Sequence, residues 1–147
     1  KVRHFGVSNF APAQFELLHS RIALATNQVE CSPLHLEPIH DGTFDQAQRL
    51  HVAPMIWSPL AGGALYTRQD EHAQKLRWSM GEVAGQHGVS LTTLALAWLM
   101  RLPCRPVPVI GSHRIEALDE AQAALNMRLS AQDWYRIWTA AAGREVA

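Results

Sequence analysis

The chain has 147 residues, 48% of them hydrophobic and 18% charged, which is the composition of a folded domain rather than of a disordered segment. Its 13 basic and 13 acidic side chains give no net charge, which argues against binding to a nucleic-acid backbone or to an anionic membrane surface. No window approaches the run of about 18 apolar residues that a membrane-spanning helix needs. The two cysteines, Cys31 and Cys104, are too few for a disulfide scaffold and are typical of free thiols in a reducing cytoplasm.

Short apolar runs alternate with amphipathic stretches along the whole chain. In chain order we expect a strand at 2–7, a helix at about 12–21, a strand at 24–29, a helix at 42–51, a strand at 54–57, helices at about 74–87 and 91–102, a strand at 108–110, a helix at 114–125 and a closing helix from residue 130. Ser90 and Ser130 are the expected N-caps, and Gly88 is the expected helix stop. The alternation indicates parallel strands joined by right-handed crossovers, and hence an α/β fold. Periodicity alone fits either a small open sheet or half of an eight-stranded barrel.

Each predicted strand ends in small or polar residues. These ends are Ser8-Asn9, Asn27-Gln28, Ser58 with Gly62-Gly63, and Gly111-Ser112. Because ligands bind at the carboxyl ends of parallel strands, the four ends should face one site. Ser, Asn and Gln side chains can bond a carboxamide, while glycine backbone and a following helix N-terminus suit phosphates. A single strand-end Asn is more often a turn former, but the set together favours a polar ligand such as a dinucleotide.

Four motifs resemble those of the aldo-keto reductases in their order and spacing. They are Gly-Val-Ser-Asn-Phe at 6–10, Asn-Gln-Val-Glu at 27–30, Trp-Ser-Pro-Leu-Ala-Gly-Gly at 57–63 and Val-Ile-Gly-Ser at 109–112. The resemblance covers nearly all of residues 1–147 and is nearest to a bacterial subgroup of NADP-dependent oxidoreductases. It implies a TIM (β/α)8 barrel, a cytoplasmic location, and NAD(P)H-dependent reduction of a small aldehyde or ketone substrate.

The resemblance also implies a cofactor-binding role for a set of residues and divides them along the dinucleotide. They are Ser8, Asn9 and Gln28 at the nicotinamide carboxamide, Trp57 on the nicotinamide ring, Ser58, Leu60, Gly62 and Gly63 at the pyrophosphate, Gly111, Ser112 and Arg114 at the adenosine ribose and its 2′-phosphate, and Glu120 at the adenine. Without the resemblance, a lone Trp after a strand would more often be a core residue. The chain departs from the family pattern at two positions: Ala117 stands where the family has an Arg, and Ala121 stands where it has an adenine-binding Asn. Arg114 can supply the missing charge, so NADP(H) is the expected cofactor and NAD(H) the alternative.

The family's catalytic residues have no counterpart in this chain. By resemblance its four units are strands 5–8, the C-terminal half of the barrel, and the family's Tyr, Lys, Asp and His lie on the earlier strands. The tyrosines here are Tyr66 and Tyr135, and the one internal lysine is Lys75. A whole TIM barrel takes about 250 residues. We therefore expect a partial reductase domain that is inactive alone, and the open edges of a half barrel predict an aggregated or dimeric protein.

The histidines and cysteines have simpler explanations than a metal or nucleophilic site. His35 and His40 share a loop, but Pro38 between them opposes a helical pairing, so no metal site is predicted. Cys31 lies just beyond a strand end without an evident base, which favours a small packing residue over a nucleophile.

Two remaining segments indicate packing rather than a different function. Residues 91–100 carry no charge, so they indicate a buried barrel helix rather than a DNA-reading helix, and no nucleic-acid partner is expected. Trp134 and Trp138, four residues apart, indicate packing of the last helix rather than a ligand site. The competing function is a non-catalytic nicotinamide-nucleotide-binding or regulatory module.

Overall fold

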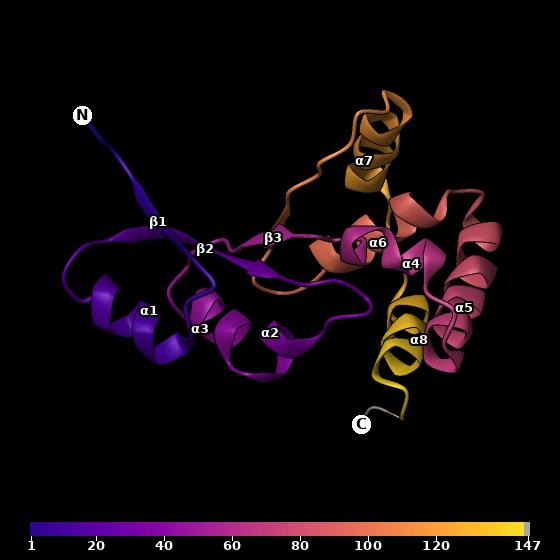
Figure 1. The fold of residues 1–147 in the computed structure, drawn as a ribbon, viewed down its shortest axis with the longest axis horizontal. Coiled ribbons are helices and arrows are strands. Elements are labelled where there is room, and N and C mark those ends of the chain that lie inside the picture. Colours follow the sequence, from indigo (N-terminus) through magenta and orange to yellow (C-terminus); the bar gives the residue numbers. More distant parts are fainter. Residues whose placement is uncertain (146–147) are drawn as a thin grey trace.

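Four parallel strands lie side by side in one sheet in the order β1-β2-β3-β4, and the computed structural model describes residues 1–145 (Figure 1). The strands are β1 (Phe5–Ser8), β2 (Leu24–Glu30), β3 (Met55–Trp57) and β4 (Val107–Pro108). The helices are α1 (Pro12–His19), α2 (Glu37–His40), α3 (Thr43–Arg49), the 3₁₀ turn η1 (Ala61–Gly63), α4 (Ala64–Thr67), α5 (Glu71–His87), α6 (Leu91–Met100), α7 (Glu116–Asn126) and α8 (Ala131–Ala142). The predicted α/β alternation and parallel sheet are confirmed.

The caps predicted from sequence are formed. The Ser90 and Ser130 hydroxyls accept from the backbone N–H groups of Thr93 and Asp133 at 3.1 and 3.0 Å, at the starts of α6 and α8. Gly88 adopts φ +64° at the end of α5, a conformation that glycine reaches without strain. These local signals fix where the long helices begin and end.

Element boundaries differ from the predictions at the sheet edges and in one loop. The first strand begins at Phe5 rather than at residue 2, because its neighbour β2 begins at Leu24, the partner of Phe5. The last strand covers 107–108 rather than 108–110, although the Val109 N–H still donates to the Ile56 carbonyl at 2.7 Å. The loop before α3 contains the short helix α2, since Pro38 stands in its first turn and favours the helix start. The helix predicted from residue 114 begins at Glu116.

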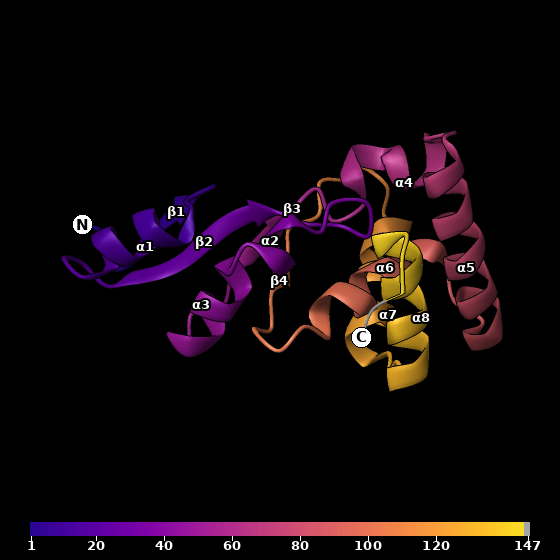
Figure 2. The same cartoon turned by 90° about the horizontal axis from the view of Figure 1, so that it is seen from below.

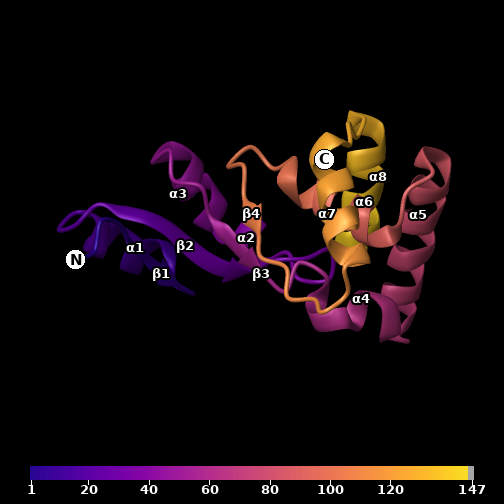
Figure 3. The same cartoon turned by 90° about the horizontal axis from the view of Figure 1, so that it is seen from above.

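The hydrophobic core lies where the sheet meets the C-terminal helices. Val29 and Ile56, on one face of β2 and β3, join a cluster with residues of α5, α6 and α8. Trp98 and Trp134 stack at 5.6 Å, and each indole N–H donates to the other's backbone carbonyl at 3.1 and 3.0 Å. All views show this helical group at one end of the molecule and β1 with α1 at the other (Figures 1, 2 and 3). The packing predicted for α6 and Trp134 is confirmed.

Exposed apolar side chains mark both ends of the sheet. Leu17 on α1 is 69% exposed and Phe5 on β1 is 45% exposed. At the other end, Val107 of β4 is 51% exposed, and Leu118 and Leu125 of α7 are 60% and 73% exposed. None of the helices among residues 1–145 is both long and apolar enough to cross a membrane.

Candidate ligand-binding site

A cavity of about 740 Å³ lies beside the carboxyl ends of β3 and β4. It is bounded by the turn after β3, by α4, by the first turn of α6, by the segment after β4 and by α7. The residues predicted to bind a ligand that line it are Ser58, Leu60, Gly62, Gly111, Ser112, Arg114 and Glu120. The structure therefore brings together two strand ends that lie about 50 residues apart in sequence.

The turn after β3 presents backbone to this cavity. Ser58, Ala61, Gly62 and Gly63 have φ of 49°, 53°, 60° and 93°. A Cβ added at Gly62 or Gly63 would meet no atom within 4 Å, so the left-handed backbone, and not crowding, favours glycine there. The open space at Gly62 leaves its backbone accessible from the cavity.

An ion pair stands at the opposite side of the cavity. Arg114 Nη2 lies 3.2 Å from Glu120 Oε2, with the two side chains 64% and 22% exposed. The Arg114 backbone N–H donates to Ser112 Oγ at 3.2 Å. Thr93 Oγ1 donates to the Glu120 carbonyl at 3.1 Å, which ties this part of α7 to α6. The pair is thus held at a fixed place at the cavity wall.

One wall of the cavity has no signal in the sequence. It is lined by Tyr66 of α4, by the N-cap Ser90, and by Leu91 and Thr92 of α6. The Tyr66 hydroxyl shares a 2.5 Å hydrogen bond with Thr92 Oγ1. The capping signal at Ser90 located the helix N-terminus, but nothing in the sequence indicated that this N-terminus faces the β3 and β4 ends.

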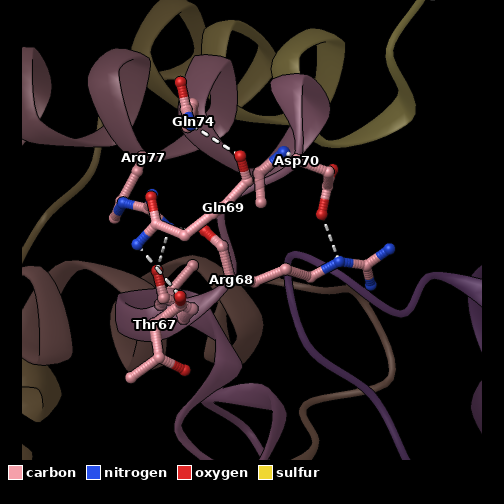
Figure 4. Close-up of polar contacts among 8 residues, drawn as sticks. Thr67, Arg68, Gln69, Asp70, Gln74 and Arg77 are labelled. Carbon is pink, nitrogen blue, oxygen red and sulfur yellow. Dashed lines mark hydrogen bonds and ion pairs between the residues drawn. The ribbon is translucent and has the colours of Figure 1, made fainter.

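The connection between α4 and α5 holds this wall in place (Figure 4). Arg77 Nη1 donates to the carbonyls of Leu65 and Arg68 at 3.1 and 2.8 Å. The Arg68 guanidinium bonds the Asp70 carboxylate, which also accepts from Ala73 N at 3.1 Å as the N-cap of α5. The Ala73 N–H and then the Arg68 guanidinium hold the pKa of Asp70 below its ordinary value. The short helix that carries the tyrosine is therefore tied to the much longer α5.

The remaining predicted residues gather beside the ends of β1, β2 and β3. Ser8 Oγ donates to the Gln28 carbonyl at 2.9 Å, and Trp57 Nε1 donates to Asn9 Oδ1 at 3.0 Å. Strand pairing places Ser8 opposite Gln28 and Glu30 opposite Trp57. Trp57 is half-buried and lies outside the hydrophobic core, next to a smaller cavity of about 320 Å³. This cluster joins the first cavity through the turn that begins at Ser58.

Asn27 has a structural place that the sequence did not reveal. Its side chain is buried, with Nδ2 donating to the Phe10 carbonyl at 2.8 Å and Oδ1 accepting from Phe10 N at 3.3 Å. Because side chains alternate along a strand, Asn27 and Gln28 point to opposite faces of the sheet. Asn27 therefore fixes the turn after β1, while Gln28 stays on the face that carries Trp57.

Lys75 and one of the histidines that were considered as metal ligands have structural contacts. Lys75 is exposed and pairs with Glu71 at 2.6 Å on α5. His40 packs edge-on against Trp138 at 6.1 Å. Among residues 1–145, no three His, Cys, Asp or Glu side chains are grouped as a metal site would require.

The two thiols are buried and unreactive in character. Burial raises the pKa of Cys31 to about 12 and that of Cys104 to about 11, so both stay protonated near neutral pH. Cys31 belongs to the hydrophobic core, which agrees with the predicted packing role.

Comparison with known proteins identifies the family. The sequence profile of the Aldo/keto reductase family matches residues 1–142. The chain is 49% identical to Oxidoreductase YdhF of Escherichia coli (strain K12), over 99% of this chain and 49% of that protein. It is 40% identical to a 6-dehydroglucose reductase of Novosphingobium aromaticivorans, over 99% of this chain and 49% of that protein. The crystal structure of the thermostable aldo-keto reductase Tm1743 in complex with the inhibitor epalrestat matches with a TM-score of 0.83 at 27% identity, over 94% of this chain and 48% of that one.

The chain spans about half the length of the relatives it matches. Its four parallel strands correspond to half of the eight strands of a TIM barrel. The resemblance seen in the four motifs is thus confirmed at the level of the family and of the fold. The chain belongs to the aldo/keto reductase family.

Proposed function

We propose that this chain is the C-terminal, cofactor-binding half of an aldo-keto reductase, with its strands in positions 5–8 of the barrel. The whole reductase would reduce an aldehyde or ketone with NADP(H) or NAD(H). The observation that carries the proposal is the cavity in which the turn after β3 meets the segment after β4. Its volume of about 740 Å³ falls in the usual range for cofactor sites, roughly 300–1,000 Å³.

The donors around this cavity fit the phosphate-rich part of a nicotinamide dinucleotide. The Ser58 hydroxyl and the left-handed backbone at Gly62 offer donors to a pyrophosphate. Ser112 Oγ already accepts from Arg114 N, so its own O–H stays free to donate to a phosphate or ribose oxygen. The guanidinium of Arg114 offers a charge at the same end.

The second cluster fits a carboxamide. Asn9 Oδ1 accepts from Trp57, which leaves Asn9 Nδ2 free to donate to a carboxamide oxygen. Ser8 Oγ donates to the Gln28 carbonyl and can accept from a carboxamide NH₂. Trp57, fixed by its bond to Asn9, would cover one face of the nicotinamide ring.

When bound, the reduced nicotinamide supplies a hydride. The residues of this chain would bind the cofactor and fix which ring face it offers. Proton donation to the carbonyl oxygen would come from the family's Tyr, supported by Lys, Asp and His, on the other half of the barrel. Substrate would then contact both halves.

Titration of the chain with NADPH and NADH tests the binding proposal. We expect saturable quenching of tryptophan fluorescence in the native chain and in Trp78→Leu, whose indole is 67% exposed on α5 and away from the cavity. Trp57→Leu should lose much of the quenching while calorimetry still detects binding. If neither NADPH nor NADH binds, the proposal is contradicted. If Trp57→Leu shows the same quenching as the native chain, the placement of the nicotinamide ring is contradicted.

A chimera tests the proposed catalysis and the assignment of this chain's strands to positions 5–8 of the barrel. The part of the E. coli relative that this chain does not match is joined to this chain, and cofactor oxidation is followed with a panel of aldehydes and ketones. The panel includes 6-dehydroglucose, because two relatives carry the name 6-dehydroglucose reductase. Carbonyl-dependent oxidation supports the reductase.

A non-catalytic nucleotide-binding module is the second candidate. The residues that could replace the family's Tyr and Lys favour it, because both are engaged elsewhere: the Tyr66 hydroxyl bonds Thr92, and the exposed Lys75 pairs with Glu71 on α5. A folded chimera that binds cofactor but oxidises none with any carbonyl of the panel would favour the module.

A further inference from the structure

Helix α5 turns one face to solvent along most of its length. Leu76, Met80 and Val83, on its inner face, are fully buried in the hydrophobic core. The opposite side, which we call the outer face of α5, is exposed and includes Glu71, Lys75, Trp78, Gly81 and Glu82. All three views place α5 at the end of the molecule away from β1 and α1 (Figures 1, 2 and 3). The outer face lines neither the cavity beside β3 and β4 nor the one beside Trp57.

Trp78 stands in the middle of the outer face. It is 67% exposed, whereas Trp98 and Trp134 are buried in the core. Tryptophan is among the residue types that contribute most where one protein binds another. A single exposed apolar side chain is common on a protein surface, so the neighbours of Trp78 decide whether it marks a contact.

Gly81 lies one helical turn after Trp78 and leaves a shallow place beside the indole. Glycine in the interior of an exposed helix is destabilising relative to alanine. A Cβ at this position would meet no atom within 4 Å, so crowding within the chain does not account for the glycine. The place left open is one into which a large side chain of another molecule can pack.

The charges beside Trp78 complement themselves when the helix is reversed. Lys75 lies three residues before Trp78, and Glu82 lies four residues after it. In an antiparallel pair of α5 helices, a two-fold axis between residues 78 and 79 sets Lys75 opposite Glu82, and an axis between residues 79 and 80 sets Trp78 opposite Gly81. The two positions differ by one residue, which is about 1.5 Å along a helix. One axis therefore serves both pairs, and each pair occurs twice.

We propose that a second copy of this chain packs antiparallel on the outer face of α5, with Trp78 of each copy over Gly81 of the other and Lys75 beside Glu82 of the other. Lys75 is free to turn toward the second copy, because its bond to Glu71 is an exposed contact within one helix. Within residues 1–145, the Glu82 carboxylate forms no ion pair. Pairing with Lys75 of the second copy supplies one.

This contact is separate from association through the ends of the sheet. Strands that extend the sheet must pair with β1 or β4, since β2 and β3 already have a neighbour on each side. Helix α5 belongs to the connection between β3 and β4. Completing the sheet into a barrel therefore leaves the outer face of α5 uncovered. One helix pair is smaller than a standard interface, so we expect a weak dimer with a dissociation constant on the order of 100 µM.

A charge exchange tests the geometry in sedimentation velocity at about 10–500 µM chain. Lys75→Glu and Glu82→Lys each place like charges opposite one another twice, and each should weaken the dimer by about fivefold to thirtyfold. The double variant restores opposite charges and the native net charge, and its association should return to within about threefold of the native value. Trp78→Ala should weaken the dimer by at least about thirtyfold.

Two controls keep the outer face apart from other causes of association. Arg49→Glu is matched to Lys75→Glu, because it reverses a charge of an exposed ion pair, with Glu16, on α3 and α1. It should leave the dimer unchanged. The same chains are also compared with Leu17 and Leu118 both replaced by Glu, which removes exposed apolar side chains near the ends of the sheet.

The expected pattern is loss of the dimer in both single charge variants and its recovery in the double variant. A chain that stays monomeric throughout this concentration range overturns the proposal. Association of Lys75→Glu equal to that of the native chain overturns it as well. A double variant that associates no better than the single ones also overturns it, because the losses would then come from something other than the pairing of Lys75 with Glu82. Cofactor binding enters none of these outcomes, so they leave the proposed function untouched.

Discussion

Gly6→Ala should loosen the pairing of β1 with β2 through a steric contact. An added Cβ would lie 2.8 Å from Thr26 Cγ2 and 3.3 Å from the Thr26 carbonyl oxygen. Overpacking of this kind costs about 1–3 kcal/mol, while the lower entropy of the unfolded alanine chain returns about 0.4–1 kcal/mol. We expect the free energy of unfolding to fall by about 1–2 kcal/mol and Tm by roughly 2–8 °C.

Urea unfolding followed by circular dichroism measures this loss, and Thr26→Ser provides the rescue. Serine removes Cγ2 but keeps the hydroxyl that donates to the Ala53 carbonyl at 2.9 Å. The double variant should recover at least half of the loss. Gly85→Ala is the control, since a Cβ on that face of α5 meets nothing within 4 Å and should be neutral or stabilising. A Gly6→Ala chain with the native urea midpoint, or a double variant whose losses simply add, would refute the steric account.

Three further predictions concern helix capping, thiol ionisation and the sheet ends. Ser130→Ala should lower the free energy of unfolding by about 1 kcal/mol in urea titrations, because the Asp133 N–H loses its cap; an unchanged midpoint would contradict this. Burial raises the pKa of Cys31 from 9.0 to about 12, so above pH 9.0 the thiol ionises in the unfolded chain and not in the folded one. The free energy of unfolding should therefore fall as the pH rises above 9.0. In urea titrations at about pH 8–10, Cys31→Ala should show a flatter dependence of this free energy on pH. Replacing the exposed Leu17 and Leu118 by Glu should reduce self-association in sedimentation velocity; a native chain that sediments as a monomer would contradict the prediction.

The sequence predicted best those features that depend on local chemistry. The caps at Ser90 and Ser130 and the stop at Gly88 are short-range hydrogen-bond and backbone effects, and each is found as expected. Strand lengths were predicted less well. The apolar run begins at residue 2, but β1 begins at Phe5 because its partner strand β2 begins at Leu24; pairing, not apolar character, decides where a strand begins.

In the candidate site too, the sequence predicts continuous segments better than contacts between distant elements. Motif resemblance located the turn after β3 and the segment after β4, since each is a continuous stretch of sequence. It did not find Tyr66 and Thr92, because their hydrogen bond depends on how α4 and α6 meet across the cavity. It also treated Arg114 and Glu120 as separate contacts with a ligand, whereas the structure joins them. Interactions between distant elements are what the sequence could not supply.

The two ends of the proposed cofactor site depend on the rest of the barrel to different degrees. The adenosine end is bounded by segments from β3 to α7, all within this chain and tied by Thr93 and the α4–α5 connection. The proposed nicotinamide end would use Ser8 and Asn9, which follow β1, an edge strand with a neighbour on one side alone among the described residues. Affinity for the adenosine part is therefore expected from this chain by itself. Under the proposal, positioning of the nicotinamide for hydride transfer would also involve the other half of the barrel, so cofactor titration and the chimera test different steps of the same proposal.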